Sequence, residues 1–199
     1  MGEPLILASA STARRNLLAA AGLQFRVQPA VVDEASIRRD LKIDRGSAAD
    51  CALALAEAKA REVARCHTDS LVLGADQILA CSDNWFNKPA DLVDARGQLQ
   101  ILSGREHELV TAACIVFREA RIWQTVASAR LTMRNFSEAF LDAYLGAEQT
   151  AILGSVGAYR LEGRGIQLFA DIQGDYFAIL GLPLLELLAF LRGRGSIAS

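Results

Sequence analysis

The chain has 199 residues, of which 52% are hydrophobic and 22% charged, and its formal net charge is −2 at pH 7. This apolar fraction excludes a disordered chain, and the slightly negative charge leaves no basic surplus for coating DNA or RNA. We therefore expect one domain over residues 1–199, with no nucleic-acid partner. A phosphate-bearing small ligand remains compatible, because a few cations in one cleft suffice to bind it.

Membrane insertion and several common catalytic patterns are not expected. The longest apolar run, residues 178–191, contains Pro183 and Glu186 and is too short to span a bilayer. The first residues lack the basic segment, apolar stretch and cleavage site of a secretory signal, so we expect a cytoplasmic protein with no membrane partner. The sequence holds neither a P-loop nor a G-x-S-x-G elbow, and its cysteines form no C-x-x-C pair.

The first part of the chain alternates predicted strands and helices. Residues 5–9 predict a buried strand, and residues 25–28 a second one. Ser11 is placed to cap the helix that follows the first strand, and residues 47–66, rich in Ala, Leu and Glu, predict the longest helix. Residues 31–46 are polar and irregular, which predicts mostly loop with one turn of helix.

Strands predominate in the middle of the chain. Residues 70–81 predict a strand interrupted at Gly74–Asp76, and residues 108–134 a β hairpin or meander. Three further helices are predicted, over residues 94–104, 137–146 and 183–193. This order of elements predicts an α/β or α+β fold with a mixed sheet. The last helix either packs on the core or contributes to a homodimer, and core packing is the default expectation.

The segment Leu7–Arg15 (LASASTARR) spans a predicted strand-to-helix junction. Ser9, Ser11 and the free N–H groups of the helix would form a donor-rich pocket suited to anions. Arg14 and Arg15 fall in the first turn, where a cation opposes the helix dipole, so we expect one of them to face a ligand. The alternative is an ordinary helix cap followed by two solvated arginines.

Acidic and lysine residues form a second group of candidates. Asp76 follows an apolar strand and a glycine, a position typical of a metal ligand or general base, although a turn residue at a strand end is the ordinary alternative. Asp33 and Glu34 are adjacent, so only one of them can point into a given cleft. Only three of the 21 basic residues are lysines: Lys42, Lys59 and Lys88. Lysine supplies a compact ammonium where a planar guanidinium does not serve.

Eight segments, in this order, closely resemble the Maf family, also called septum-formation-inhibitor-like proteins. They are LASAS-x-x-R-R, VDE, ALAEAKA, VLGADQ, KP, LSGREHEL, GSVGAYRLEGRGIQLF and GDYF-x-x-x-GLPL. The resemblance covers essentially the whole chain. It implies an α/β fold of the inosine-triphosphatase-like type, a mixed twisted sheet flanked by helices, with a deep groove between two lobes. It also implies a nucleoside triphosphate pyrophosphatase that releases a nucleoside monophosphate and pyrophosphate with a divalent metal cation, Mg²⁺ or Mn²⁺.

The resemblance also assigns roles to individual residues. Asp76 matches the family's catalytic aspartate, taken as general base and also as a metal ligand. Glu34 matches the acid of the VDE segment and would help to hold the metal. Lys59 and Lys88 match the family's lysines and would bind phosphate oxygens as point charges. Three residues match the family's N-terminal phosphate pocket: Ser9, Ser11 and Arg14.

Three positions in the family are taken to select the base, and here they hold Ala13, Gln77 and Glu162. Gln77 and Glu162 look like the subgroup that prefers 7-methyl-GTP, and a carboxylate suits both the N–H edge of guanine and a cationic ring. Ala13 fits neither this subgroup nor the one that prefers dTTP and UTP, and Phe25 or Trp85 are candidates for the missing aromatic face. The alternatives are a dTTP/UTP pyrophosphatase, a nucleotide-binding regulator of septum formation without catalysis, and a different phosphohydrolase that acts on inosine or xanthosine triphosphates and shares the fold but not these motifs.

Overall fold

The computed structural model describes residues 3–198, and these contain a seven-stranded mixed sheet. Its strands are β1 (Leu5–Leu7), β2 (Phe25–Val27), β3 (Leu71–Cys81), β4 (Asn84–Phe86), β5 (Glu106–Phe117), β6 (Ala120–Met133) and β7 (Phe169–Gln173). The order is β2-β1-β3-β5-β6-β7, with β4 paired to β3. β1 runs parallel to β2 and β3, and the remaining pairs are antiparallel. The predicted mixed sheet and the hairpin of β5 and β6 are confirmed.

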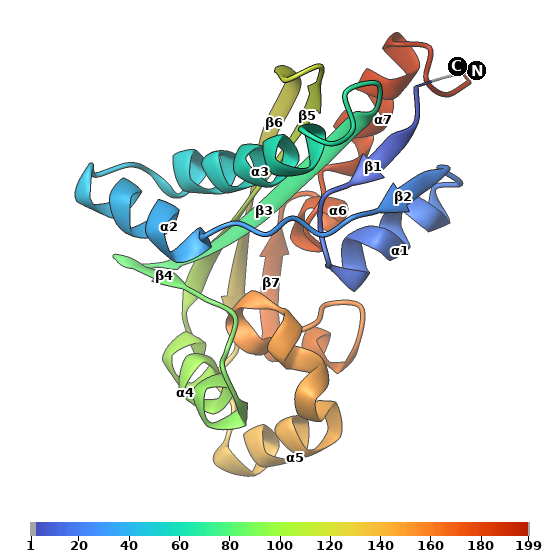
Figure 1. Cartoon of the computed structure of the whole chain (residues 1–199). Coiled ribbons are helices and arrows are strands. Elements are labelled where there is room, and N and C mark those ends of the chain that lie inside the picture. The colour runs from blue at the N-terminus through green and yellow to red at the C-terminus, as the bar shows by residue number, and fades with distance from the viewer. Residues whose placement is uncertain (1–2, 199) are drawn as a thin grey trace.

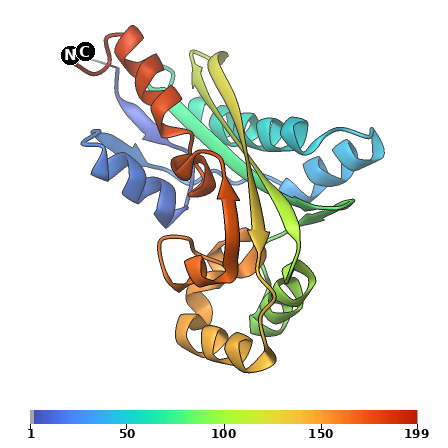
Figure 2. The same cartoon turned by 180° about the vertical axis from the view of Figure 1, so that it is seen from behind.

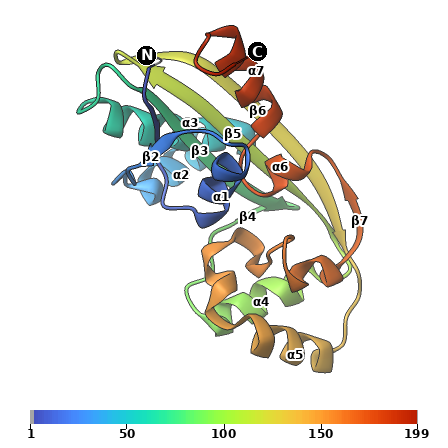
Figure 3. The same ribbon diagram turned by 90° about the vertical axis from the view of Figure 1, so that its right-hand side faces the viewer.

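Helices cover both faces of the sheet and one of its ends. They are α1 (Thr12–Ala20), α2 (Glu34–Ile43), α3 (Ala48–Ala64), α4 (Leu92–Leu102), α5 (Glu138–Glu148), α6 (Tyr176–Ile179) and α7 (Leu184–Gly193), with 3₁₀ helices η1 (Gln149–Gly154), η2 (Val156–Ala158) and η3 (Arg164–Leu168). Figure 1 shows α3 along one face of the long strands, and the reverse view in Figure 2 shows α6 and α7 along the other. Figure 3 shows α4, α5 and the 3₁₀ helices gathered at one end, which we call the α4–α5 lobe.

Local sequence signals fix most helix ends. The side chains of Ser11, Ser47 and Ser137 each accept a hydrogen bond from a backbone N–H in the first turn of the helix that follows, as predicted for Ser11. α7 buries Leu184, Leu187 and Leu191 against the core, so its predicted core packing is confirmed. Whether the chain also forms a homodimer stays a prediction. No helix within residues 3–198 has the length and apolar character needed to cross a membrane.

The prediction of mostly loop over residues 31–46 is wrong, because α2 occupies Glu34–Ile43. The side chain of Asp33 caps this helix by accepting from the Ser36 N–H at 3.0 Å. Ile37 and Leu41, one turn apart, pack against the core beneath. A stripe of only two apolar residues in a charged segment is a weak periodic signal, so the helix depends on its tertiary contact.

The predicted interruption of the strand at Gly74–Asp76 is also wrong, since β3 runs without a break from Leu71 to Cys81. Gly74 pairs with Cys114 of β5 in regular register. A Cβ at position 74 would lie 2.0 Å from the backbone oxygen of Ala56 in α3. Gly74 therefore serves the close approach of α3 to β3, and Asp76 lies in the middle of a strand.

Candidate active site

A cavity of about 990 Å³ lies between the α4–α5 lobe and the part of the fold that contains α1 to α3. Side chains from the segments 8–16 and 29–38 contribute to its lining on one side, and side chains from the segment 151–162 on the other, although not every residue of these segments lines it. The structure therefore has the deep groove that the sequence predicts. All ten predicted site residues line this cavity: Ser9, Ser11, Ala13, Arg14, Glu34, Lys59, Asp76, Gln77, Lys88 and Glu162. A volume near the upper end of ordinary ligand sites can accommodate a molecule as large as a nucleotide.

The cavity opens onto an unpaired stretch of one edge of β3. On this edge β1 pairs with residues 71–73 and β4 with residues 79–81, so within the described structure residues 74–78 have no strand partner there. The carbonyl of Ala75 instead accepts from Arg14 Nη1 at 2.8 Å. Asp76 and Gln77 both lie in this gap, which is why neighbouring residues on a strand reach one cavity.

Three charged side chains from three elements meet beside this gap. Lys59 of α3 donates from Nζ to Asp76 Oδ1 at 2.5 Å and lies 2.7 Å from Glu34 Oε1 at the start of α2. The side chains of Lys59 and Asp76 are only 11% and 7% exposed, so water screens this pair far less than it would a surface pair. Asp33 caps α2 from outside the cavity lining, so of the two adjacent acids only Glu34 points into the cavity.

Arg38 is a site residue that the sequence prediction missed. Its Nη2 lies 3.4 Å from Asp76 Oδ2 and 3.7 Å from Glu34 Oε2. Glu34 and Arg38 are four residues apart, so α2 presents them on one face. This spacing is visible in the sequence, but it places two side chains on one face only in a helix, and the sequence predicts mostly loop over residues 31–46.

The charged side chains of the cavity shift the pKa values of their neighbours. Burial alone would raise the pKa of Glu34, but the hydrogen bond and charge of Lys59, with the charges of Arg38 and Lys88, hold that pKa below its usual value. Loss of hydration, together with repulsion from Arg14 and Lys59, lowers the pKa of Lys88. An anionic ligand would relieve this repulsion among cations.

Arg14 connects the N-terminal part of the cavity wall to other parts of the chain. Its guanidinium is buried, and it donates to Gly181 O at 2.7 Å and to Ser9 Oγ at 3.1 Å. Burial lowers the pKa of Arg14, while the charges of Asp76 and Glu34 act in the opposite direction. Arg15 is exposed and outside the cavity lining, so Arg14 is the arginine of the pair that faces the site.

Two of the predicted base-selecting residues, Gln77 and Glu162, are held by hydrogen bonds or ion pairs to other parts of the fold. Gln77 Nε2 donates to Thr111 Oγ1 at 2.7 Å and lies 3.1 Å from the carbonyl oxygens of Ala178 and Ile179. Carbonyls only accept, so this contact fixes the orientation of the amide and leaves Oε1 for a ligand. Glu162 is paired with Arg160, whose Nε lies 3.3 Å from Oε1.

The aromatic face expected from Phe25 or Trp85 is not found there. Phe25 packs against the core, and Trp85 lies under the ammonium of Lys42, whose Nζ is 5.3 Å from the ring centroid. Among the described residues that line the cavity, Tyr159 is the one aromatic side chain, and it is only 5% exposed.

The donor set fits a hard divalent cation that shares its ligands with a substrate. Within residues 3–198 no cluster of three or more His, Cys, Asp or Glu side chains could hold a metal on its own. Glu34 and Asp76 nevertheless place carboxylate oxygens around one point, since both contact the same Lys59 Nζ. Mg²⁺ is usually bound through one or two carboxylates plus substrate phosphates and water, which matches two acids beside a group of cations.

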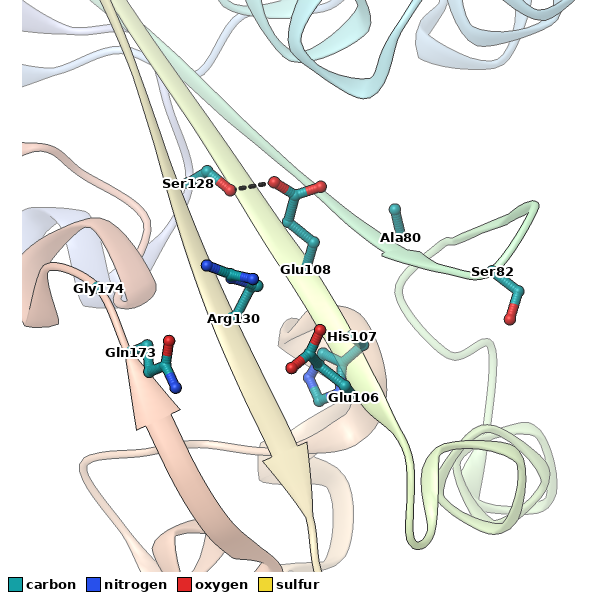
Figure 4. A pocket seen from close by; sticks show the side chains of 9 residues that line it. All are labelled: Ala80, Ser82, Glu106, His107, Glu108, Ser128, Arg130, Gln173 and Gly174. Carbon is teal, nitrogen blue, oxygen red and sulfur yellow. Dashed lines mark hydrogen bonds between the residues drawn. The ribbon is translucent and has the colours of Figure 1, made fainter.

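A second cavity, of about 700 Å³, lies on the sheet over β3, β5 and β6. Figure 4 shows its acidic side chains, Glu106 and Glu108, with Arg130 nearby and Ser128 donating a hydrogen bond to Glu108. None of the ten predicted site residues is among the residues that line it. The chemistry expected from the sequence therefore gathers in the larger cavity.

Comparison with known proteins identifies the family of the chain. A family model described as Maf-like protein matches residues 4–194. The chain belongs to the Maf family. It is 51% identical over 188 residues to a nucleoside triphosphate pyrophosphatase of Granulibacter bethesdensis, covering 94% of this chain and 95% of the relative. It is 48% identical over 193 residues to a 7-methyl-GTP pyrophosphatase of Rhizobium meliloti, covering 97% of each. A dITP/XTP pyrophosphatase structure from Mycobacterium abscessus aligns over 96% of this chain and 95% of its own, with 16% identity and a TM-score of 0.41.

Proposed function

We propose that this Maf-family protein is a nucleoside triphosphate pyrophosphatase that hydrolyses the bond between the α- and β-phosphates, releasing a nucleoside monophosphate and pyrophosphate. The observation that carries the proposal is the meeting of Asp76, Glu34 and Lys59 in one cavity, with Arg14 and Lys88 along its lining. Hydrolysis of this bond requires an activated water and cations along the triphosphate, and this cavity offers a base and several cations, Arg14, Lys59 and Lys88 among them. We place this reaction in the cytoplasm, with residues 1–199 acting as one domain.

In the proposed complex, different cations of the cavity bind different phosphate oxygens of the triphosphate. Lys59 and Lys88 offer ammonium groups that bind phosphate oxygens without a fixed geometry, while Arg14 supplies a rigid guanidinium beside Ser9. Ser11 and the first N–H groups of α1 line the cavity next to them, and a helix N-terminus favours an anion. Phosphate binding there offsets the mutual repulsion of these cations.

Asp76 is the group we assign as general base. Its carboxylate lies in the cavity beside Lys59, which also contacts Glu34, the second acid. In the proposed reaction Asp76 takes the proton of the water that attacks the α-phosphate. A divalent cation such as Mg²⁺ or Mn²⁺, if bound by these two carboxylates, would neutralise negative charge on the phosphate oxygens. Lys59 contacts both acids in the described structure, and its flexible stem would let the ammonium exchange a carboxylate oxygen for a phosphate oxygen.

The base-selecting side chains favour a modified guanine nucleotide such as 7-methyl-GTP. Gln77 presents the acceptor Oε1, because its Nε2 is taken up by α6, and Glu162 can only accept when ionised. Two acceptors suit the N1–H and N2–H₂ donors of guanine, and a carboxylate also attracts the positive charge of an N7-methylated ring. Ala13 matches neither subgroup, so it favours neither 7-methyl-GTP nor dTTP and UTP.

A panel of nucleoside triphosphates with Mg²⁺ or Mn²⁺ tests the reaction. We expect pyrophosphate and the monophosphate as products, with 7-methyl-GTP turned over faster than dTTP or UTP. Release of inorganic phosphate would mean that a different bond is cut. Tight nucleotide binding with no product at all would instead favour a nucleotide-binding regulator of septum formation, and faster turnover of dTTP and UTP would reassign the substrate.

Glu162→Gln tests the choice of base separately from the reaction. The ratio of kcat/KM for 7-methyl-GTP to that for UTP is expected to fall by about tenfold, because replacing a charged hydrogen-bond acceptor with a neutral one loses about 1–1.5 kcal/mol. Glu106→Gln, in the second cavity, is the matched control and should leave the ratio as it is. An unchanged ratio in Glu162→Gln would remove this carboxylate from base selection.

A further inference from the structure

We propose that Arg38 is a positioning residue for the pyrophosphatase reaction: it holds the carboxylates of Asp76 and Glu34 side by side when Lys59 is drawn to the phosphates. This inference rests on the proposed function. It assigns a distinct task to a residue that lies outside the segments on which the family resemblance was recognised.

The geometry divides the four carboxylate oxygens between two cations. Lys59 contacts one oxygen of each acid, Asp76 Oδ1 and Glu34 Oε1, whereas Arg38 lies beside the other two, Asp76 Oδ2 and Glu34 Oε2. Two carboxylates this close repel each other, and cations between them offset that repulsion. The two acids are therefore bridged twice, by side chains from α3 and from α2.

The two bridges differ in how tightly they are made. The Lys59 contacts are 2.5 and 2.7 Å long, while those of Arg38 are 3.4 and 3.7 Å. Lys59 carries its ammonium on a flexible stem and can exchange a carboxylate oxygen for a phosphate oxygen with little rearrangement. Arg38 has a planar guanidinium whose single Nη2 faces both acids, so it can keep them together without the lysine.

Burial indicates that Arg38 is kept in this place against a free-energy penalty. Its side chain is 16% exposed, and its Nη1 is buried without a hydrogen-bond acceptor in the described part of the chain. A buried donor left unsatisfied costs about 1–3 kcal/mol. The neighbouring Arg39 avoids that penalty, because it is 66% exposed and lies near Asp40 at the surface of the same helix.

These contacts predict an effect on turnover rather than on substrate affinity. Arg38→Gln is expected to lower kcat by about 10- to 100-fold, the scale that follows when reacting groups are misplaced by about 1 Å. KM for the nucleotide should stay within about threefold of the wild-type value, because the phosphate-binding cations remain. Arg39→Gln, the matched control, should change neither constant.

The experiment measures pyrophosphate release per folded site, with folding checked by circular dichroism and sites counted by binding of a non-hydrolysable nucleotide analogue. Where Arg38→Gln does not fold, Arg38→Lys keeps the charge and the stem, and a smaller loss of kcat at unchanged KM is expected, because a flexible ammonium holds the two carboxylates less rigidly than a planar guanidinium. A tenfold rise in KM at unchanged kcat would make Arg38 a phosphate ligand instead, and unchanged constants would give it no role; either result overturns the proposal. A wild-type protein that releases no pyrophosphate would refute the proposed function itself.

Discussion

Asp76→Asn is expected to lower the turnover of every nucleoside triphosphate by at least about 10²-fold, the usual scale for losing general acid–base catalysis. Asparagine has nearly the same shape, but it cannot take a proton from the attacking water. It also removes the negative charge that Lys59 and Arg38 contact through Oδ1 and Oδ2. Because the side chain is only 7% exposed, water does not replace those contacts.

The measurement is pyrophosphate release with saturating Mg²⁺, made beside the control variant Asp40→Asn. Asp40 lies on α2 and is 66% exposed, so its charge can be removed without touching the cavity. Circular dichroism and nucleotide binding establish that the Asp76 variant is folded. Near-normal turnover in that folded variant would take the role of base away from Asp76 and leave Glu34 as the acid to test.

The sequence predicted most elements because their signals are local. Serine caps, alternating apolar residues and an alanine-rich helix act within a few neighbouring residues, and the structure keeps them. α2 was missed because its apolar stripe is only Ile37 and Leu41, so its stability comes from a surface that the sequence does not display. Arg38 was lost with it, although its spacing from Glu34 is visible once the helix is known.

The arrangement around β3 could not be read from the sequence either. Asp76 and Gln77 reach one cavity because β1 and β4 leave a gap between them on one edge of β3, and strand lengths set that gap. The orientation of the Gln77 amide depends on carbonyls of α6, about a hundred residues away in sequence. Tertiary contacts of this kind decide which atom a side chain offers to a ligand, so residue type alone gave only the list of candidates.

Gly74→Ala is the change expected to disturb fold and site together. The added Cβ would lie 2.0 Å from the backbone oxygen of Ala56, and a backbone atom inside a helix cannot move away alone. α3 must therefore shift from β3, and overpacking of this kind costs about 1–3 kcal/mol of unfolding free energy. Lys59 is one turn beyond Ala56 on α3, so the same shift lengthens its contact with Asp76.

Denaturant unfolding and pyrophosphate release, measured on the same preparation, separate the two effects. Gly97→Ala is the matched control: Gly97 lies inside α4 with no atom within 4 Å of an added Cβ, so that variant should be as stable as the wild type or gain about 0.5–1 kcal/mol. For Gly74→Ala we expect lower stability together with a fall in turnover per folded molecule. If the folded Gly74→Ala protein kept full turnover, the close packing of α3 on β3 would serve stability alone, because the ion pair between Lys59 and Asp76 would tolerate displacement of the helix.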